Sequence, residues 1–582
     1  MQKVYLRLFA VIMIICLAFS ACTGKTGTTD AENGQSGNAG NENGLNGSGD
    51  NGSQNGTDGN ENGGNTGNDS GNDPAAGEEY DGPVEIVDDS YRNYYEIFVY
   101  SFYDSNGDGY GDLNGVIKKL DYVADMGYTG IWFMPVHPSP TYHKYDITDY
   151  YDIDPKYGTL DDMKNLIKEA HARNIDIILD LVVNHTSSNH PWFKEACSEI
   201  TKNGEPSGKY KDWFNFQNKR DVGYSEVGST GWYYEARFWS GMPDLNLDNP
   251  EVRDEIRNIM KYWFDLGVDG FRLDACTSYY TGSVDRNVEF LNWLSTTAHE
   301  LKQDCFLVGE AWENADPLIR RYYDSGLDSF FIFTAATGEG SIVTGPLSFS
   351  AKNCGLKFND LLLQLQKIYD VGIPSMFLGN HDTARAANFL RKSMPERVKM
   401  AEGILAMMPG ALFTYYGEEI GMLGMGDDPN KRIAMLWDEL YSEGYCTKSP
   451  EGIAVNNDSY YFESVAGQQA DEASILNYYK KAMKIRNLYP EIARGKVEVL
   501  NGLSGVTAGD QVSVTRRKWN GSSVIVVMNL NMQEEETVYL DKAVLGYGDK
   551  MSRLLANPNY SIVKGSKEGE FTMSPYSILV LK

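Results

Sequence analysis

Hydrophobic and polar positions along the chain predict short strands separated by amphipathic helices. Residues 94–102 are aromatic and β-branched and alternate in polarity, which is typical of a strand. Apolar positions then recur at helical spacing from Asp112 to a stop at Gly127, and residues 129–134 form a second apolar run. Residues 175–183 are almost all apolar, as expected for a strand of a parallel sheet covered on both faces.

The same alternation continues through the middle of the chain. Residues 249–266 are predicted to be a helix, because Asn249 is a good N-cap, Pro250 suits the first helical position and Gly267 suits the stop. Further strands are expected near Val268, Phe306, Ser329, Ile373 and Ala411. The resulting eight strand–helix units predict an α/β fold of the (β/α)8 TIM-barrel type.

Two stretches do not fit this repeat. Residues 185–241 are aromatic, irregular and too long for an ordinary connection, which indicates a small domain inserted after the third strand. After a helix at about 474–488, residues 496–582 carry short alternating strands typical of an antiparallel β-sandwich. The predicted domains are a signal peptide at 1–22, a tether at 23–89, the barrel at 90–184 and 242–490, the insertion at 185–241 and a C-terminal β-domain at 491–582.

The first ninety residues resemble the leader of an exported protein. Lys3 and Arg7 precede an apolar run over residues 8–19, which is a signal-peptide pattern. The run ends at Cys22 in a sequence that resembles the lipobox of bacterial lipoproteins. We therefore expect lipid attachment at Cys22 and a location on the extracellular face of the bacterial cell envelope, with plain secretion as the alternative. Residues 23–89 are rich in Gly, Asn, Ser and Asp, so a disordered tether is expected.

The net charge and the cysteine pattern argue against some classes of partner and of site. The formal net charge of -29 argues against nucleic acid as a partner. Five cysteines remain after Cys16 and Cys22 are set aside, and they show neither zinc spacing nor a disulfide framework. We interpret them as mostly buried thiols.

Polar residues gather at the carboxyl ends of the predicted barrel strands, where catalytic groups of such barrels lie. They are Asn184, His185, Arg272, Asp274, Glu310, His381 and Asp382. Two facing carboxylates in an aromatic cleft suit glycoside hydrolysis, one as nucleophile and the other as proton donor. A buried structural ion pair is the alternative interpretation of Arg272 and Asp274.

The loop after the first predicted strand has the pattern of a calcium-binding loop. Its oxygen-bearing positions are Asp104, Asn106, Asp108, Tyr110 (through its carbonyl) and Asp112. Side-chain oxygens at positions 1, 3, 5 and 9 with glycine at position 6 match the first part of such a loop, although position 12 is Gly115 rather than Glu. An acidic turn without metal is the alternative. Three aspartates exclude a phosphate-binding loop.

Four of these stretches resemble the conserved regions of the α-amylase family, glycoside hydrolase family 13. They are Asp180-Leu-Val-Val-Asn184-His185, Gly270-Phe-Arg272-Leu-Asp274, Val308-Gly-Glu310-Ala-Trp312 and Phe377-Leu-Gly-Asn380-His381-Asp382. Residues 127–135 and 242–246 resemble two further family regions, the second being typical of the group between neopullulanases and oligo-1,6-glucosidases. The resemblance covers about residues 91–582.

By this resemblance Asp274 is the nucleophile, Glu310 the acid/base and Asp382 a third carboxylate that stabilises the transition state. Arg272 beside Asp274 favours the ionised form of that carboxylate, whereas Glu310 must hold a proton, so its surroundings should raise its pKa. The family positions that grip the sugar correspond to His143, Tyr145, His185 and His381. The loop from residue 104 to 112 matches a metal site of the oligo-1,6-glucosidase-like branch, which implies Ca²⁺.

The chain departs from many secreted α-amylases at Thr277 and Ser278, where those enzymes carry Lys-His. This departure puts a second calcium site in doubt. Ala275 stands where α-1,6-specific relatives tend to have valine, which favours α-1,4 cleavage. We expect a monomeric, retaining, endo-acting α-amylase on starch-like glucans. The alternatives are a neopullulanase-like or transglycosylating enzyme and a non-catalytic starch-binding lipoprotein.

Overall fold

The computed structural model describes residues 79–80, 82–313, 316–336, 340–348, 352–390, 392–453, 460–546 and 550–582. The predicted signal peptide, Cys22 and most of the predicted tether lie outside these ranges. Within them, we find no helix with the length and apolar character needed to cross a membrane.

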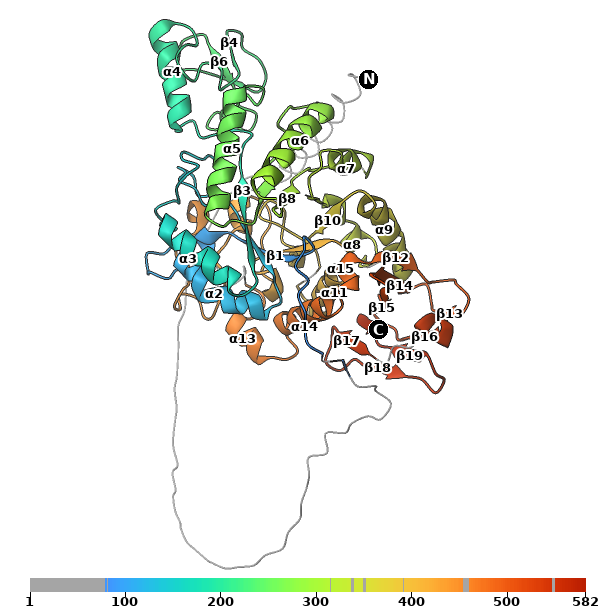
Figure 1. The fold of residues 1–582 in the computed structure, drawn as a ribbon. Coiled ribbons are helices and arrows are strands. Elements are labelled where there is room, and N and C mark those ends of the chain that lie inside the picture. The colour runs from blue at the N-terminus through green and yellow to red at the C-terminus, as the bar shows by residue number, and fades with distance from the viewer. Residues whose placement is uncertain are drawn as a thin grey trace, which may run out of the picture. The chain divides into compact units, whose positions relative to one another are not determined.

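Eight parallel strands close into a barrel, in agreement with the predicted fold class (Figure 1). In chain order they are β1 Asn93–Ile97, β2 Gly130–Phe133, β3 Asp176–Leu181, β7 Gly270–Leu273, β8 Phe306–Gly309, β9 Ser329–Phe331, β10 Ile373–Met376 and β11 Ala411–Tyr415. Around the barrel the order is β1-β11-β10-β9-β8-β7-β3-β2. Buried aromatic side chains of Tyr94, Trp132, Phe306, Phe331 and Phe413 fill its interior.

Helices follow the strands, and side-chain caps mark the starts of several of them. The longer ones are α2 Leu113–Asp125, α3 Leu160–His171, α5 Pro250–Asp265, α6 Val284–Leu301, α7 Asp316–Tyr323, α9 Cys354–Tyr369, α11 Pro395–Ala406 and α14 Ile475–Leu488. Asp112 and Asn249 accept backbone N–H groups as N-caps, and Thr159 forms a capping box with Asp162. Short helices are α8 Ser341–Thr344, α10 Ala386–Phe389, α12 Asp428–Lys431, α13 Val465–Ala470 and α15 Glu491–Arg494, with 3-10 turns at Phe333–Ala335, Glu418–Ile420 and Pro450–Gly452.

The first predicted strand is shorter than its alternating pattern indicated. Strand β1 ends at Ile97, and Val99–Ser101 form a 3-10 turn. The aromatic side chains of Phe98, Tyr100 and Phe102 are all buried in the core. The alternation therefore reflects packing of a loop against the core and not the two faces of a strand.

A small three-stranded unit lies between β3 and β7. It contains α4 Pro191–Asn203 and the sheet β4-β6-β5, formed by Phe216–Gln217, Tyr233–Glu235 and Tyr224–Glu226. Two isolated bridges, His185 to Asp244 and Phe214 to Leu245, hold the start and the end of this segment together. The segment is thus attached directly beside the end of β3.

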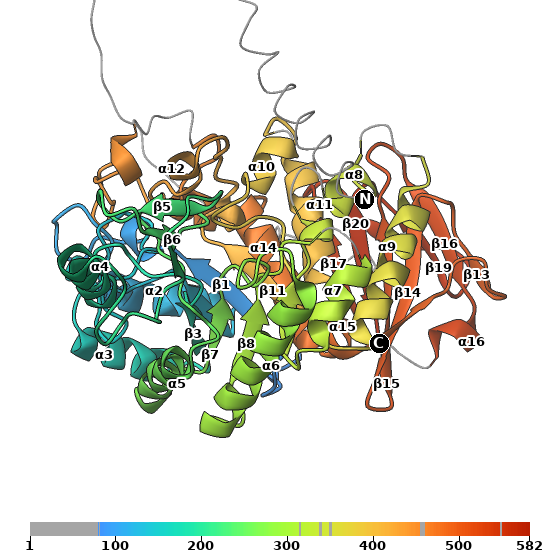
Figure 2. The same ribbon diagram turned by 90° about the horizontal axis from the view of Figure 1, so that it is seen from above.

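Two antiparallel sheets form the C-terminal part of the chain (Figure 2). The five-stranded sheet contains β12 Lys496–Val499, β14 Val512–Trp519, β15 Ser522–Asn529, β20 Ser577–Leu581 and β17 Met551–Leu555. The four-stranded sheet contains β13 Val506–Thr507, β16 Glu536–Leu540, β19 Glu570–Met573 and β18 Ile562–Lys564. The short helix α16 Lys542–Leu545 follows β16 in the chain. Buried side chains such as Val514, Val527, Val538 and Phe571 come from both sheets and form one core.

The chain is already attached to the folded body before β1. Glu79 forms a β-bridge with Met551, and the N–H of Tyr80 donates to the Met551 carbonyl at 2.7 Å. Asp89 accepts two hydrogen bonds from the Arg494 guanidinium at 2.6 and 2.7 Å. Glu79, Tyr80 and Asp89, which lie within the predicted tether, therefore contact the folded body.

Candidate active site

Arg272 lies at the centre of the polar cluster, near the carboxyl end of β7. Its Nη1 atom lies 2.8 Å from Asp180 and 2.7 Å from Asp274, and its Nη2 atom lies 2.9 Å from Glu310. The side chain of Arg272 is only 1% exposed. Parallel pairing places Asp180 of β3 opposite Arg272 and Val308 of β8 on its other side, which brings these strand ends together. One cation is therefore shared by three carboxyl groups.

Glu310 directly follows β8 and is buried. Its Oε2 atom accepts the backbone N–H of Ala275 at 2.8 Å. Burial raises the pKa of Glu310 to about 8, with added repulsion from Asp274 and Asp382, although Arg272 acts in the opposite direction. Glu310 is accordingly protonated at neutral pH, as a proton donor must be.

Asp382 follows β10 and is kept as a carboxylate. It contacts Nε2 of His381 at 3.1 Å and Nη2 of Arg432 at 2.8 Å. Burial acts to raise its pKa, but His381 and then Arg432 together bring the pKa of Asp382 well below its ordinary value. Its side chain is 29% exposed, which leaves it accessible to a ligand at the barrel mouth.

His381 connects Asp382 to the barrel wall. Its Nδ1 atom contacts Glu96 of β1 at 2.5 Å, and its Nε2 atom lies 2.7 Å from the hydroxyl of Tyr145. Burial acts to lower the pKa of His381, but Asp382 and Glu96 raise it to about 9, so the ring carries a positive charge at neutral pH. The Tyr145 ring stacks on it with centroids 5.6 Å apart.

The other two predicted histidines are neutral. Burial lowers the pKa of His143 to about 4, and its Nδ1 atom accepts the Tyr145 N–H at 3.2 Å. Burial also lowers the pKa of His185, whose ring lies 5.2 Å from the exposed ring of Phe238. Neutral imidazoles can each donate and accept a hydrogen bond, which suits contacts with sugar hydroxyls. The structure thus places all eight predicted catalytic and sugar-binding residues at one end of the barrel.

Three members of this cluster were not predicted as site residues: Asp180, Glu96 and Arg432. Asp180 and Glu96 are carboxylates near the carboxyl ends of buried strands, and a charged residue at such a position is a signal that could have identified them. Arg432 comes from the loop after β11, where the local sequence gives no such signal. It contacts Asp382 across 50 residues of chain.

The predicted calcium loop is a folded turn in which carboxylates bind backbone N–H groups. Asp104 accepts from Gly107 and Gly109 at 2.7 Å each, and Asp112 accepts from Gly115 at 2.7 Å as the N-cap of α2. Asp, Asn and carbonyl oxygens are the donor types that Ca²⁺ prefers. Among the described residues, however, no three His, Cys, Asp or Glu side chains lie together as a ready metal site.

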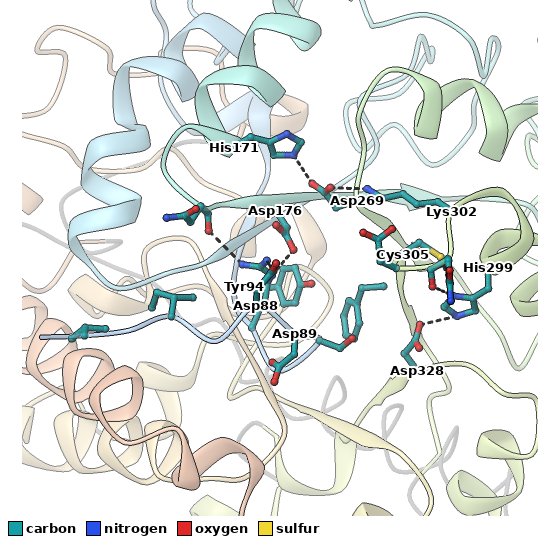
Figure 3. A pocket seen from close by; sticks show the side chains of 18 residues that line it. Asp88, Asp89, Tyr94, His171, Asp176, Asp269, His299, Lys302, Cys305 and Asp328 are labelled. Carbon is teal, nitrogen blue, oxygen red and sulfur yellow. Dashed lines mark hydrogen bonds and ion pairs between the residues drawn. The ribbon is translucent and has the colours of Figure 1, made fainter. Parts of the chain in front are cut away.

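A cavity of about 710 Å³ lies at the opposite end of the barrel, at the amino ends of the strands (Figure 3). Several of its polar side chains are paired with one another. Asp269 contacts His171 at 2.7 Å and Lys302 at 2.8 Å, and Asp328 contacts His299 at 3.4 Å. Another cavity, of about 220 Å³, lies between the inserted segment and the loop after β7.

Comparison with known proteins agrees with this geometry. Residues 96–495 match the model of the α-amylase catalytic domain. The chain is 38% identical over 456 residues to α-amylase 3 of Dictyoglomus thermophilum, covering 76% of this chain and 86% of that protein. It is 31% identical over 532 residues to an oligo-1,6-glucosidase of Heyndrickxia coagulans, covering 77% and 92%.

Among solved structures, Eubacterium rectale Amy13B superimposes with a TM-score of 0.79 and 39% identity, over 86% of this chain and 97% of that one. The family match covers more than half of the chain and includes every residue of the polar cluster, from Glu96 to Arg432. The chain belongs to the α-amylase family of glycoside hydrolases.

Proposed function

We propose that this glycoside hydrolase is an endo-acting α-amylase that cleaves α-1,4-glucosidic bonds of starch-like glucans with retention of configuration. The observation that supports this most is the pairing of buried Glu310, whose pKa is raised to about 8, with Asp274 on the same guanidinium of Arg272. A proton donor and a nucleophile need opposite protonation states, and two different environments on one cation can provide them.

In the proposed mechanism, the Asp274 carboxylate attacks the anomeric carbon while Glu310 gives its proton to the leaving glycosidic oxygen. Glu310, now a carboxylate, next removes a proton from water, whose oxygen displaces Asp274 from the sugar. Asp382 stays anionic and binds sugar hydroxyls, and its charge stabilises the oxocarbenium-like transition state. His143 and His185 are the neutral hydrogen-bonding partners of the sugar.

The stereochemistry and the linkage are tested by the products. NMR of the first products from an α-glucan should show α-anomers, and β-anomers appearing first would overturn the assignment of Asp274. Soluble starch should be cut internally and faster than pullulan or cyclodextrin. Preference for pullulan or cyclodextrin would favour the neopullulanase-like alternative.

The neopullulanase-like or transglycosylating alternative draws on the relatives. One relative of the chain is named an oligo-1,6-glucosidase and another, 30% identical, a trehalose-6-phosphate hydrolase. Ala275, which follows the nucleophile, favours α-1,4 cleavage. A non-catalytic binding role is disfavoured because Asp274, Glu310 and Asp382 are all present.

We also propose that the loop from Asp104 to Asp112 binds one Ca²⁺ through Asp104, Asn106, Asp108, the Tyr110 carbonyl and Asp112. A carboxylate oxygen has two lone pairs, so an oxygen that accepts a backbone N–H can also contact a cation. The bound ion would stabilise the loop by mass action. A chelator should lower the melting temperature, and Asp108→Ala should abolish this sensitivity. A wild-type melt unchanged by chelator and by calcium would contradict the site.

We further propose that Cys22 carries diacylglycerol and holds a monomeric enzyme on the outer face of a membrane. Two acyl chains on one residue give stable anchoring, which one chain does not. Cys22→Ala should release active enzyme into the medium or block processing. An unchanged membrane fraction would refute the anchor, and a dimer mass in light scattering would refute the monomer.

A further inference from the structure

Arg517 is a buried cation between the barrel and the C-terminal sheets. It lies on β14, whose side chains alternate between two faces. Ser513, four residues earlier on the same face, donates its hydroxyl to Asn359 of α9 at 2.7 Å. Arg517 therefore points toward α9, beside which β14 lies (Figure 2), and it is 0% exposed.

The guanidinium of Arg517 has no hydrogen-bond partner among the described residues. This holds for Nε, Nη1 and Nη2 alike, and it holds for the hydroxyl of Tyr369, which closes α9. Tyr369 lies close enough to Arg517 to interact with it electrostatically. A buried charge without partners is costly, so a native protein normally supplies a counter-charge.

The charged side chains near Arg517 do not supply this counter-charge. Arg486 donates to neutral oxygens only, including Asn93 Oδ1 at 2.7 Å and the Gly410 carbonyl at 2.6 Å. Arg494 is paired with Asp89. The surroundings thus hold two buried guanidinium groups, Arg486 and Arg517, for which no carboxylate partner is found in the described ranges.

A cavity of about 150 Å³ adjoins this position and is lined by Tyr91, Gln366, Tyr369, Asp370, Gly410 and Arg494, among others. Asp370 is exposed and accepts a hydrogen bond from Gln366 at 3.4 Å. Burial raises the pKa of Tyr369 far above neutral pH, so its hydroxyl is a donor and not an anion. Arginine keeps its proton in proteins, so the positive charge of Arg517 persists.

We propose that Arg517 and the Tyr369 hydroxyl bind a small monovalent anion, chloride, at the junction of α9 and β14. The donors there are charged and neutral N–H and O–H groups, which are the groups that bind halides. The anion neutralises a buried guanidinium and connects a barrel helix to the C-terminal sheet. This site lies away from the catalytic cluster, and its test is independent of glucan hydrolysis.

Thermal unfolding of the whole chain tests the site. Chloride replaces gluconate stepwise at constant ionic strength, and the melting temperature should rise saturably, by about 2–5 °C at roughly 100 times the dissociation constant. Arg517→Met removes the charge and the donors while keeping much of the volume, so it should abolish the rise. Arg516→Met is the matched control, because Arg516 is already bound to Glu498 at 3.2 Å and to the Val544 carbonyl at 2.7 Å.

A crystal of the wild-type protein grown in bromide gives an independent result that does not need a folded variant. An anomalous peak between Arg517 and Tyr369 would support the proposal. Ordered water alone at this position would overturn it. A melting temperature that does not respond to chloride, or that responds equally in Arg517→Met, would also overturn it.

Discussion

At the carboxyl ends of the barrel strands three carboxyl groups share one guanidinium, that of Arg272, whereas at the amino ends the single carboxylate of Asp269 is paired with both Lys302 and His171. The consequence is seen in the protonation states. Burial raises the pKa of Glu310 to about 8, because the shared guanidinium of Arg272 does not offset the effect of burial. The pKa of Asp269 is lowered despite its burial, by hydrogen bonds from His171 and Lys302.

This difference in ion pairing distinguishes the end of the barrel that holds a transferable proton from the end whose ion pairs stabilise the fold. Where cations are too few, one carboxyl group retains a proton that it can transfer, and where each carboxylate has its own partners, no proton is available. Asp176 is an exception at the amino ends, because burial raises its pKa to about 7 even though Arg92 is its partner. We therefore expect variants at the two ends to change different quantities.

The largest effect should follow from Glu310→Gln. Glutamine keeps the shape but cannot donate a proton, and general acid catalysis contributes roughly 10²–10⁴ in rate, so hydrolysis of starch should fall by at least this factor. An α-glucosyl fluoride, whose leaving group needs little protonation, should lose much less. Rates are measured on both substrates. Starch hydrolysis at the wild-type rate would exclude Glu310 as the acid.

A second variant, Arg272→Met, should lower stability as well as activity. Removing the cation leaves Asp180, Asp274 and Glu310 without their shared partner, and breaking buried pairs of this kind costs about 3–5 kcal/mol. Thermal unfolding measures the loss. Arg173→Met is the control, because Arg173 pairs on the surface with Asp121 and Glu169 and should cost about 0–1 kcal/mol. Equal losses of stability in Arg272→Met and Arg173→Met would contradict the difference between a buried, shared cation and a surface ion pair.

At the amino ends, Asp269→Asn should lower stability and leave catalysis intact. The carboxylate binds His171, Lys302 and the Ile177 N–H, and losing charge-assisted hydrogen bonds of this kind costs about 1–3 kcal/mol. The measurements are thermal unfolding and kcat on soluble starch at a temperature well below the melt. A large drop in kcat would show that the amino ends contribute to the chemistry.

The smallest expected effects are in pH dependence. Activity should fall as pH rises through about 8, because Glu310 then loses the proton that it donates. Hydrogen bonding to Asp328, and then to Cys305, raises the pKa of His299 from 6.5 to about 11. A raised folded-state pKa stabilises the protein fully below pH 6.5, and this stabilisation is lost as pH rises toward 11.

Asp328→Asn should therefore flatten the decline of the melting temperature between pH 6.5 and 9 without moving the pH profile of activity. Melting curves and kcat/KM profiles of both proteins across this range provide the measurement. A variant with the wild-type melting profile would show that the His299–Asp328 contact carries no pH-dependent stability.

Local signals explain which parts of the molecule could be predicted from sequence. The helix starts at Asp112, Thr159 and Asn249 are encoded by side chains that cap their own backbone, so they were found without knowledge of the fold. The strand ends that carry Asp274 and Glu310 follow from strand–helix alternation. The family resemblance added the roles of these residues, which remain predictions.

Other features depend on contacts between distant segments. Arg432 reaches Asp382, and Glu96 reaches His381 across 285 residues, so no short stretch of sequence reports either pairing. The end of β1 at Ile97 was missed because buried aromatic residues in a loop reproduce the alternation of a strand. The buried position of Arg517 depends on how β14 packs on α9.

The bridge between Glu79 and Met551 determines how mechanical force would enter the folded body. A pull on the chain before Glu79 acts first on the edge strand β17 and then on the clamp between Asp89 and Arg494. Glu79 and Asp89 both precede β1 in the chain, so the C-terminal sheet would bear part of the pulling force before the force reached β1, the strand that carries Glu96. A pull on the chain before Glu79 would therefore have to break these two contacts before it acted on β1.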